Sequence, residues 1–505
     1  MELTSAKQMR NADDTAIHVL GIPSSLLMRN AARALARAAI EMMGQNRSAV
    51  IFCGSGNNGG DGVACASYML LRGVEVRVLL VGSREKMTDD TREMERRFGE
   101  LGGELEIFDP LESGLAEGLD SVGVIVDALF GVGLSRDIEG TALEAVRLMN
   151  SAKAPVIAAD IPSGVDADTG KIMGEAVRCE KTVTFSMAKP GHFIEPGCIY
   201  CGEITIADIG IPPEVLKNCG CGVYAVSKED ISLPPRPRLS HKGDFGKLLV
   251  IGGSVGYTGA PSLCAKAAER SGAGLVYLGV PRDIYEITAV KNDGAMPFPL
   301  LCDNEGRISI AALPKINERL GKCDICVIGP GLGRSDEMSS LITKVISSAQ
   351  CRLVLDADAL FAAAQDTSVL KKAKYPPVLT PHEGEFVRLN GAGITDRISD
   401  ARRFSQENNC ILVLKGHRTL IAFPDADVFI LQTGGPGMAK GGSGDVLSGV
   451  IGAMLGQMPL KEAVLSAVWI HGRAGDICAQ ELGEYSVTPS DIILALPKSI
   501  KQILR

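Results

Sequence analysis

One stretch near the start of the chain decides its fold: Ala49-Val-Ile-Phe-Cys53-Gly-Ser-Gly-Asn-Asn-Gly-Gly-Asp-Gly62. Its five leading apolar residues predict a buried strand, the glycines predict a tight turn, and a helical pattern begins after the turn. Further apolar runs at residues 74–81, 122–127 and 156–160 alternate with amphipathic segments. This alternation predicts βαβ units, and therefore an α/β fold with mainly parallel sheets.

The same pattern starts again after a proline-rich connector. Residues 232–238 include three prolines, which exclude a regular helix or a central strand there. Strands are predicted beyond the connector at residues 247–251, 274–280, 325–328, 352–356, 377–380 and 411–414, with a helix at 261–270. We therefore expect two three-layer αβα domains, the first over residues 1–222 and the second over residues 228–505.

A helical arm precedes the first strand. Residues 5–18 and 23–43 carry apolar side chains at helical spacing, and we expect them to pack on the sheet or on another subunit. The lone tryptophan, Trp469, lies in an apolar helical segment and is expected in the core. We expect the protein to form a homo-oligomer, with the arm as one available surface.

The composition of the chain argues against a nucleic-acid-binding protein and against a membrane protein. The 505 residues include 52 Lys and Arg against 60 Asp and Glu, so the net charge of -8 offers no basic surface for nucleic acid or an anionic membrane. The chain has no run of about 18 apolar residues, and its first residues lack the apolar core of a secretory signal. We therefore expect no membrane segment and a cytoplasmic location. The 14 cysteines are then expected as free thiols, including the closely spaced pairs Cys198/Cys201 and Cys323/Cys326.

The glycine-rich turn at residues 54–62 suits a phosphate or pyrophosphate, because backbone amides and a helix N-terminus converge there. It matches the spacing GxGxxG, but the second strand ends without the acidic residue that dinucleotide binding would require. The turn also lacks the Gly-Lys-Ser/Thr of a P-loop. Its unusual feature is the density of side-chain oxygen from Asn57, Asn58 and Asp61.

Two later strands end in aspartates. Asp127 precedes the loop 131–137, and Asp160 precedes a loop that contains Ser163 and Asp166. Ligands of open α/β sheets bind outside the carboxyl ends of the strands, so these side chains are expected at the same edge as the glycine-rich turn.

Together with the segment Lys189-Pro-Gly-His192, these three loops resemble the epimerase half of the bifunctional NAD(P)H-hydrate repair enzymes, over nearly all of residues 1–220. The resemblance implies a Rossmann-like domain that interconverts the R and S forms of hydrated NADH or NADPH. It implies substrate contacts from Asn57, Asn58, Gly59, Gly60, Asp61, Gly131, Val132, Gly133, Leu134, Ser135, Arg136, Asp137 and Asp160. It also implies a potassium ion held by Asn58, Asp127 and Ser163.

Epimerising a carbon that bears a hydroxyl beside a ring nitrogen needs ring opening or hydroxide loss, and therefore a positioned proton carrier. Asp160 is the candidate. Lys189 is either a second proton donor that also stabilises charge or an ordinary surface lysine beside a Pro-Gly turn.

The strongest motif of the second half is Gly434-Gly-Pro-Gly-Met-Ala-Lys-Gly-Gly-Ser-Gly-Asp445, which leads into an apolar helix expected at residues 446–455. Clustered glycines ahead of a helix let backbone amides converge on a phosphate, and an aspartate beside that site can act as a base. A favourable position at the helix N-terminus explains Asp445 alone but does not explain the glycines. The motif resembles the anion hole and base of the ribokinase-like fold.

The remaining loops resemble the dehydratase half of the same repair enzymes, from about residue 230 to 495. The loops that carry the resemblance are 242–247, 250–260, 329–333, Asp356-Ala-Asp358, Thr380-Pro-His382-Glu-Gly-Glu385 and 415–419. It implies that Ala260, Gly333, His382 and Asp445 contact the hydrated nucleotide. It also implies that Lys415, Gly416, His417, Arg418, Thr419 and Gly444 bind the adenine nucleotide. Outside such a motif, His382 would more simply stabilise a turn.

The expected reaction converts the hydroxyl group, a poor leaving group, into a phosphate ester, from which phosphate leaves readily. Asp445 would take the proton of the hydroxyl, the oxygen would attack the terminal phosphoryl group of ADP or ATP, and phosphate would then leave. Magnesium is expected on the nucleotide phosphates, with Glu383 or Glu385 as candidate ligands. We expect ADP, because the two domains are fused as in bacterial relatives. The alternative is a ribokinase-like small-molecule kinase fused to a non-catalytic nucleotide-binding module.

Overall fold

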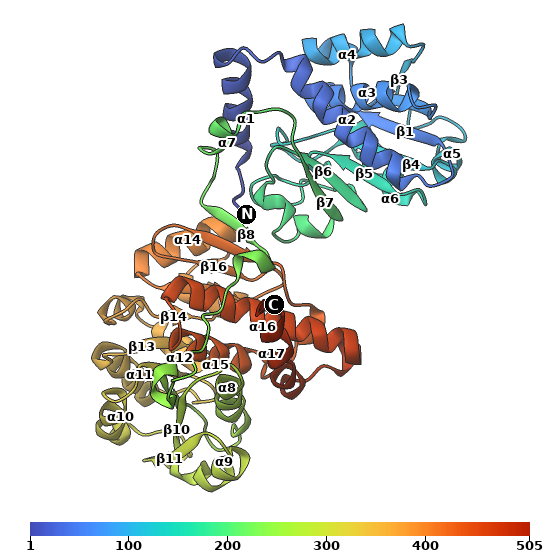
Figure 1. The fold of residues 1–505 in the computed structure, drawn as a ribbon. Coiled ribbons are helices and arrows are strands. Elements are labelled where there is room, and N and C mark those ends of the chain that lie inside the picture. The colour runs from blue at the N-terminus through green and yellow to red at the C-terminus, as the bar shows by residue number, and fades with distance from the viewer. Residues whose placement is uncertain (505) are drawn as a thin grey trace. The chain divides into compact units, whose positions relative to one another are not determined.

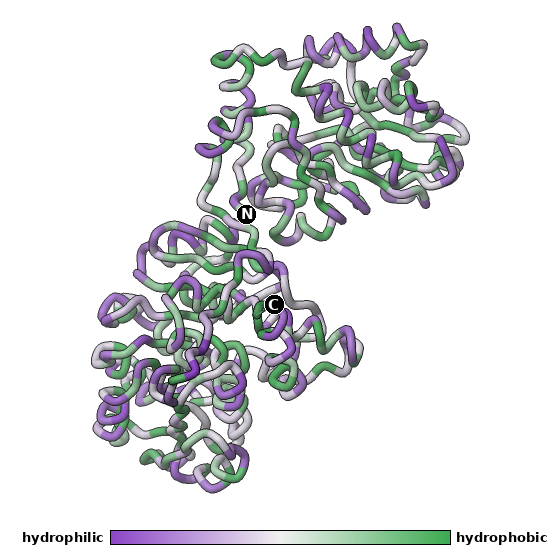
Figure 2. The backbone as a smooth tube through the Cα atoms, in the orientation of Figure 1, coloured by the Kyte–Doolittle hydropathy of each residue, from purple (hydrophilic) through white to green (hydrophobic). Residues whose placement is uncertain are grey.

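The computed structural model describes residues 1–504, which form two compact units (Figure 1). One unit comprises Glu2–Val223, and the other comprises Met1 and the residues from Tyr224 onward. In Figure 2 hydrophobic stretches follow the strands of both units, as expected for buried sheets covered by helices.

The N-terminal unit contains a seven-stranded sheet in the order β3-β2-β1-β4-β5-β6-β7, and every neighbouring pair is parallel. Its strands are β1 (Ser48–Cys53), β2 (Glu75–Leu80), β3 (Leu105–Ile107), β4 (Val124–Ala128), β5 (Val156–Ala159), β6 (Lys181–Phe185) and β7 (Glu203–Ala207). The four strands predicted in this half are β1, β2, β4 and β5. The order changes direction beside β1, where β1 and β4 pair, and such switch points are where ligands bind in open sheets.

Alternate residues of β1 show the three layers. Ile51 and Cys53 face one core with helices α2 (Ser24–Met42), α3 (Asn57–Leu70) and α4 (Asp89–Glu100). Val50 and Phe52 face the opposite core with α5 (Leu115–Asp120) and α6 (Gly140–Ser151). The predicted N-terminal helix is α1 (Ala6–Asp14), which continues as a wide π-helical turn over Thr15–Val19. A short helix, α7 (Pro213–Leu216), follows β7.

The C-terminal unit contains a ten-stranded sheet in the order β11-β10-β9-β12-β13-β14-β15-β16-β17-β8. The pairs from β11 to β15 are parallel, whereas β15, β16 and β17 pair in antiparallel fashion. The strands are β8 (Val223–Val226), β9 (Lys247–Ile251), β10 (Leu275–Pro281), β11 (Met296–Leu300), β12 (Ile325–Ile328), β13 (Arg352–Leu355), β14 (Val378–Leu379), β15 (Ile411–Leu414), β16 (Leu420–Ala422) and β17 (Val428–Leu431). All six strands predicted in this half are present.

One face of this sheet shares a core with α8 (Gly259–Arg270), α15 (Ser443–Leu455), α16 (Leu460–Leu482) and α17 (Pro489–Ile503). Trp469 lies in this core with 4% of its surface exposed, which confirms its predicted place. The other helices are α9 (Tyr285–Lys291), α10 (Leu313–Leu320), α11 (Asp336–Ser348), α12 (Asp358–Ala363), α13 (Glu383–Asn390) and α14 (Arg397–Asn408). Helix α15 begins at Ser443, three residues before its predicted start, so Gly444 and Asp445 belong to its first turn.

Within residues 1–504, none of the helices combines the length and the apolar character needed to cross a bilayer. All fourteen cysteines lie in this part of the chain, and eleven of them are buried.

Two candidate active sites

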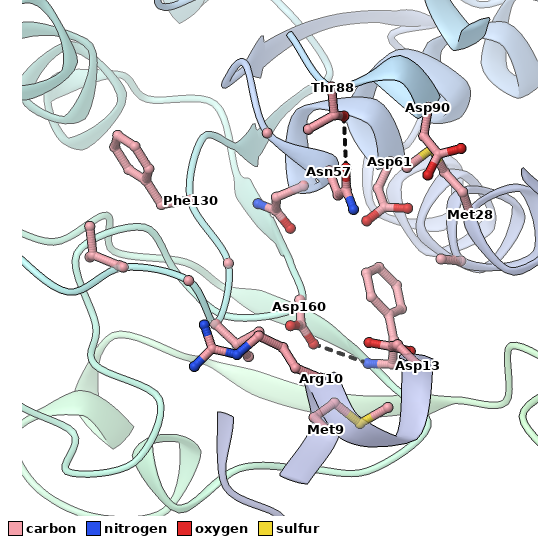
Figure 3. Close-up of a pocket in the computed structure, with 18 of the residues that line it drawn as sticks. Met9, Arg10, Asp13, Met28, Asn57, Asp61, Thr88, Asp90, Phe130 and Asp160 are labelled. Atoms are coloured by element: carbon pink, nitrogen blue, oxygen red, sulfur yellow. Dashed lines mark hydrogen bonds between the residues drawn. The ribbon is translucent and has the colours of Figure 1, made fainter. Parts of the chain in front are cut away.

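A cavity of about 720 Å³ opens in the N-terminal unit (Figure 3). Residues from each loop singled out in the sequence line it: Asn57, Asn58, Asp61, Gly131, Val132, Gly133, Leu134, Arg136, Asp160 and Lys189. Gly59, Gly60, Ser135 and Asp137, also predicted to contact substrate, are not among the lining residues. Gly59 packs so closely on the backbone of Gly54 that a side chain would collide with it, which explains the glycine on structural grounds.

Asp160 and Lys189 form a buried ion pair at this cavity. Lys189, 1% exposed, donates from Nζ to Asp160 Oδ1 at 2.5 Å and to Thr184 Oγ1 at 2.9 Å. Burial alone would raise the pKa of Asp160, but the ammonium of Lys189 outweighs it and lowers that pKa. The interpretation of Lys189 as a surface lysine is therefore wrong, because the loop after Phe185 folds its side chain inward.

His192 fixes the backbone around this pair. Its Nδ1 accepts from the backbone N–H of Lys189 at 3.0 Å, so its Nε2 carries the hydrogen and donates to the carbonyl of Asp160 at 2.9 Å. Burial lowers the pKa of His192 to about 4, which keeps the ring neutral at physiological pH. The backbone at Asp160 has a φ of 66°, so these two hydrogen bonds hold a strained conformation in place.

The predicted potassium ligands include a fully buried carboxylate. Asp127 accepts hydrogen bonds from Ser163 Oγ at 2.6 Å, Ser163 N at 2.7 Å and Leu129 N at 3.2 Å. Burial raises the pKa of Asp127 to about 6, because these neutral donors compensate its charge only in part. The side-chain Nδ2 of Asn58 is buried without a hydrogen-bond partner among the described residues. A carboxylate, a hydroxyl and an amide oxygen suit a hard monovalent cation, so these residues fit the expected ion.

In the C-terminal unit, Asp445 lies in the first turn of α15 behind the glycine-rich segment. Burial, aided by Asp356, raises the pKa of Asp445 to about 7, and the nearby ammonium of Lys415 opposes the increase. A Cβ on Gly444 would lie 3.2 Å from Lys415 Nζ, so this glycine lets the helix start approach the ammonium. The predicted base and the predicted nucleotide-binding lysine are therefore neighbours.

Asp356 organises this second cluster. It is 1% exposed, accepts from Lys415 Nζ at 3.1 Å, and accepts from Ser448 Oγ at 2.6 Å. Lys415 also lies 3.9 Å from Glu385. Opposite charges therefore hold Lys415 beside the start of α15.

The predicted magnesium ligands have other partners. Glu385 and His382 form a capping box at the start of α13, since Glu385 N donates to His382 Nδ1 at 3.3 Å and His382 N donates to Glu385 Oε2 at 2.9 Å. Glu383 pairs with Arg397 at 3.4 Å. With a lysine or an arginine beside each carboxylate, neither glutamate fits a direct magnesium ligand. His382 does stabilise a turn, while 61% of its side chain stays exposed.

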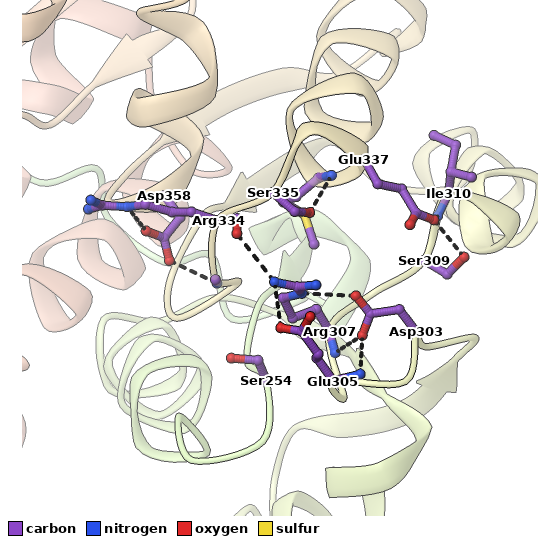
Figure 4. Close-up of polar contacts among 12 residues, drawn as sticks. Ser254, Asp303, Glu305, Arg307, Ser309, Ile310, Arg334, Ser335, Glu337 and Asp358 are labelled. Atoms are coloured by element: carbon purple, nitrogen blue, oxygen red, sulfur yellow. Dashed lines mark hydrogen bonds and ion pairs between the residues drawn. The ribbon is translucent and has the colours of Figure 1, made fainter.

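Gly333 is held by a polar network (Figure 4). Asp358 accepts from Gly333 N at 2.9 Å and from Arg334 Nε at 2.9 Å. Arg307 pairs with Asp303 at 2.9 Å and donates to the carbonyl of Arg334 at 3.3 Å. Ala260 belongs to the same region, because a Cβ on Gly331 would lie 3.3 Å from the Ala260 Cβ. Two of the predicted substrate contacts thus come together.

The predicted nucleotide loop, residues 415–419, follows β15. Lys415 forms an isolated parallel β-bridge with His382, which lies in the loop after β14. The two loops therefore lie side by side at one edge of the sheet. Thr419 Oγ1 donates to the carbonyl of Gly416 at 3.1 Å, and Arg418 Nη1 donates to the carbonyl of Gln432 at 3.1 Å. His417 completes the loop, in which Gly416 and His417 are exposed and Lys415, Arg418 and Thr419 are half-buried.

Comparison with known proteins matches both halves. Residues 248–498 match the family described as NAD(P)H-hydrate dehydratase, and residues 24–191 match the YjeF-related protein N-terminus. The bifunctional NAD(P)H-hydrate repair enzyme Nnr of Moorella thermoacetica is 38% identical, covering 100% of this chain and 97% of the relative. The protein of the same name from Thermofilum pendens is 36% identical with the same coverage. The chain belongs to the family of bifunctional NAD(P)H-hydrate repair enzymes.

The predicted fold of this family member is confirmed. A solved ribokinase-like superfamily protein from Enterococcus faecalis V583 is 29% identical, with a TM-score of 0.51 over 56% of this chain and 97% of that chain. The C-terminal unit is therefore ribokinase-like, and the N-terminal unit with its parallel sheet is Rossmann-like.

Sequence reasoning missed two acidic residues in this NAD(P)H-hydrate repair family member. Asp13 of α1 lines the N-terminal cavity, although the helical pattern of the arm indicated only packing. Asp356 was noticed within a motif but was not assigned to the site. The available signal for Asp356 was its position at the end of a predicted buried strand, the same signal that identified Asp127 and Asp160.

Proposed function

We propose that residues 1–222 epimerise the R and S forms of hydrated NADH or NADPH, and that residues 228–505 dehydrate the S form. The second reaction would consume ADP and yield AMP and phosphate. The observation that carries the proposal is Asp445, a half-buried carboxyl in the first turn of α15 beside Lys415 and behind four residues rich in glycine. Membership of the repair-enzyme family supports both activities.

In the dehydratase site, Asp445 accepts the proton of the substrate hydroxyl. The oxygen then attacks the terminal phosphoryl group, and the amides of residues 441–444 stabilise the charge that builds on it. Lys415 contributes a positive charge that Asp356 and Glu385 hold in place. Phosphate leaves from the ester formed. Magnesium, when bound to the nucleotide, would shield its phosphate charges.

In the epimerase site, Asp160 and Lys189 handle the proton. The cavity lined by Asn57, Asn58, Asp61, residues 131–134 and Arg136 receives the nucleotide. Asn58, Asp127 and Ser163 would hold potassium, which compensates the buried carboxylate and fixes the loops that meet there.

The decisive experiment mixes the purified protein with hydrated NADH and either ADP or ATP. Recovery of the reduced-nicotinamide absorbance is expected, faster with ADP, and no recovery with either nucleotide would refute dehydration. A small-molecule kinase would instead accumulate a phosphorylated product. Starting from the pure R form tests the first unit. An Asp160→Ala protein that converts R to S as fast as the wild type would exclude Asp160 as the proton carrier, and a wild-type rate no higher than the spontaneous rate would support a non-catalytic module.

We also propose a cytoplasmic location and a homo-oligomeric assembly. Fourteen cysteines, eleven of them buried, suit a reducing compartment. Val19 and Leu20, 75% and 51% exposed after α1, offer apolar surface for contact between subunits.

A further inference from the structure

Helix α1 forms part of the wall of the N-terminal cavity. Met9, Arg10 and Asp13 of this helix line it together with Asp160 and Lys189 (Figure 3). The arm therefore does more than pack on the sheet, because it brings a fourth acidic side chain, besides Asp61, Asp90 and Asp160, to the place where substrate would bind.

The carboxyl group of Asp13 has no polar partner in the described part of the chain. Among residues 1–504, no side chain or backbone group forms a hydrogen bond or ion pair with it. Asp160, by contrast, accepts at Oδ1 from Lys189, Thr184 and the backbone of Phe185. A partly buried carboxyl without partners costs stability, and a structure retains such a group most readily where a ligand or a reaction uses it.

We propose that Asp13 is a further catalytic residue of the epimerase site, the base that takes the hydroxyl proton of the hydrated nicotinamide ring. This inference rests on the proposed epimerase function. The Asp160–Lys189 pair then acts as the acid on the other side of the reacting carbon.

The proton transfers balance in both directions. Asp13 removes the proton of the hydroxyl, whose oxygen forms a C=O bond as the bond from that carbon to the ring nitrogen breaks. The electron pair of the broken bond stays on nitrogen, which receives a proton from Lys189. After rotation of the open aldehyde, nitrogen attacks its opposite face, and each proton returns to the group that supplied it. No oxidant, reductant or further reactant is needed.

The surroundings of Asp13 suit a base. Burial, with the negative charge of Asp160, raises its pKa to about 6, while the ammonium of Lys189 limits the increase. Asp13 is therefore mostly ionised at pH 7 and still more basic than an exposed carboxylate. Burial, with the negative charges of Asp160, Asp13 and Asp90, raises the pKa of Asp61 well above its usual range. The charged or titratable groups around Asp13 are Asp14 and Arg10 on α1, Asp61 on α3, Asp160, Lys189 and Cys219.

The test uses the full-length protein and the pure R form of hydrated NADH without ADP, so that conversion to the S form reports epimerisation alone. The variant is Asp13→Asn, and the matched control is Asp14→Asn, the same change at the next, exposed position of α1. Chromatography would separate the isomers between pH 5 and pH 8, with the spontaneous rate subtracted. Urea unfolding of each variant checks that the N-terminal unit is folded, and dehydration of the S form with ADP checks the C-terminal unit.

We expect Asp13→Asn to lower kcat at least about 100-fold with little change in KM, as for loss of a general base. The wild-type rate should rise with pH, with a midpoint near pH 6 and a plateau above about pH 7, because the base must be ionised, and the variant should lose this rise. Asp14→Asn should stay within about twofold of the wild type at pH 7.5, since it leaves the cavity wall intact.

Two results would overturn the inference. An Asp13→Asn protein that epimerises like the wild type excludes Asp13 as the base. A pH-dependent rise that persists in Asp13→Asn but disappears in Asp61→Asn assigns the role to Asp61 instead. A wild-type protein that leaves the R form unconverted refutes the proposed epimerase function itself, which distinguishes the two failures.

Discussion

The rate of dehydration should be about tenfold lower at pH 6 than at pH 8, because Asp445 must be ionised before it can accept a proton. Burial and Asp356 raise the pKa of Asp445 to about 7. A group with that pKa is about 91% ionised at pH 8 and about 9% ionised at pH 6, which gives the tenfold decrease.

The assay is the initial recovery of reduced-nicotinamide absorbance from the S form with saturating ADP, across pH 5.5 to 8.5. The terminal phosphate of ADP also titrates near this range, so a variant must separate the two groups. Asp356→Asn removes the neighbouring charge that raises the pKa of Asp445 and keeps a side chain of similar shape beside Ser448. The midpoint should therefore move to lower pH.

The matched control is Asp336→Asn, an exposed aspartate in the first turn of α11, which should leave the midpoint unchanged. A wild-type profile that is flat between pH 6 and pH 8 would refute Asp445 as the titrating base. A midpoint that stays fixed in Asp356→Asn would assign the titration to the nucleotide rather than to the protein.

Three further outcomes test the two sites. Lys189→Met should abolish epimerisation and destabilise the N-terminal unit by about 3–5 kcal/mol in urea unfolding, because it leaves the Asp160 carboxylate buried without its cation; an unchanged midpoint would contradict this. Burial raises the pKa of Asp127 from 3.8 to about 6, so the folded protein favours the protonated carboxyl. The free energy of unfolding should therefore fall by about 3 kcal/mol as the pH rises from below 3.8 to above about 6. Potassium chloride should therefore raise the Tm relative to choline chloride more at pH 7.5 than at pH 5, and Asp127→Asn should remove the difference. Asp445→Ala should abolish dehydration and leave conversion of R to S intact, whereas loss of both activities would mean that the sites are not separate.

The acids at the sheet edges could be predicted from the sequence because their placement depends on topology alone. Asp127 and Asp160 each lie at or directly after the end of a parallel strand, and all such ends share one edge. The burial of Lys189 could not be predicted, since a Pro-Gly turn has the same local sequence whether it lies on the surface or folds inward.

Two other features depend on contacts between distant parts of the chain. The pattern of α1 shows that one face is apolar, but the docking of the helix decides whether Asp13 reaches the cavity. The partners of Asp356 are Lys415 and Ser448, which are 59 and 92 residues away in sequence. No local pattern encodes such separations. The helix α15 began earlier than expected because its first turn tolerates Gly444, although glycine is a poor helix former.

The position of strand β8 limits how the polypeptide can be divided for separate production of its halves. Residues Val223–Val226 form the last strand of the C-terminal sheet, next to β17, although they precede the proline-rich segment at which a gene would most naturally be split. A truncated gene starting beyond codon 226 would encode a protein with the hydrogen-bonding groups of β17 uncovered, and such open edges recruit other chains into aggregates. Recombinant expression of the dehydratase half should therefore begin at or before codon 223.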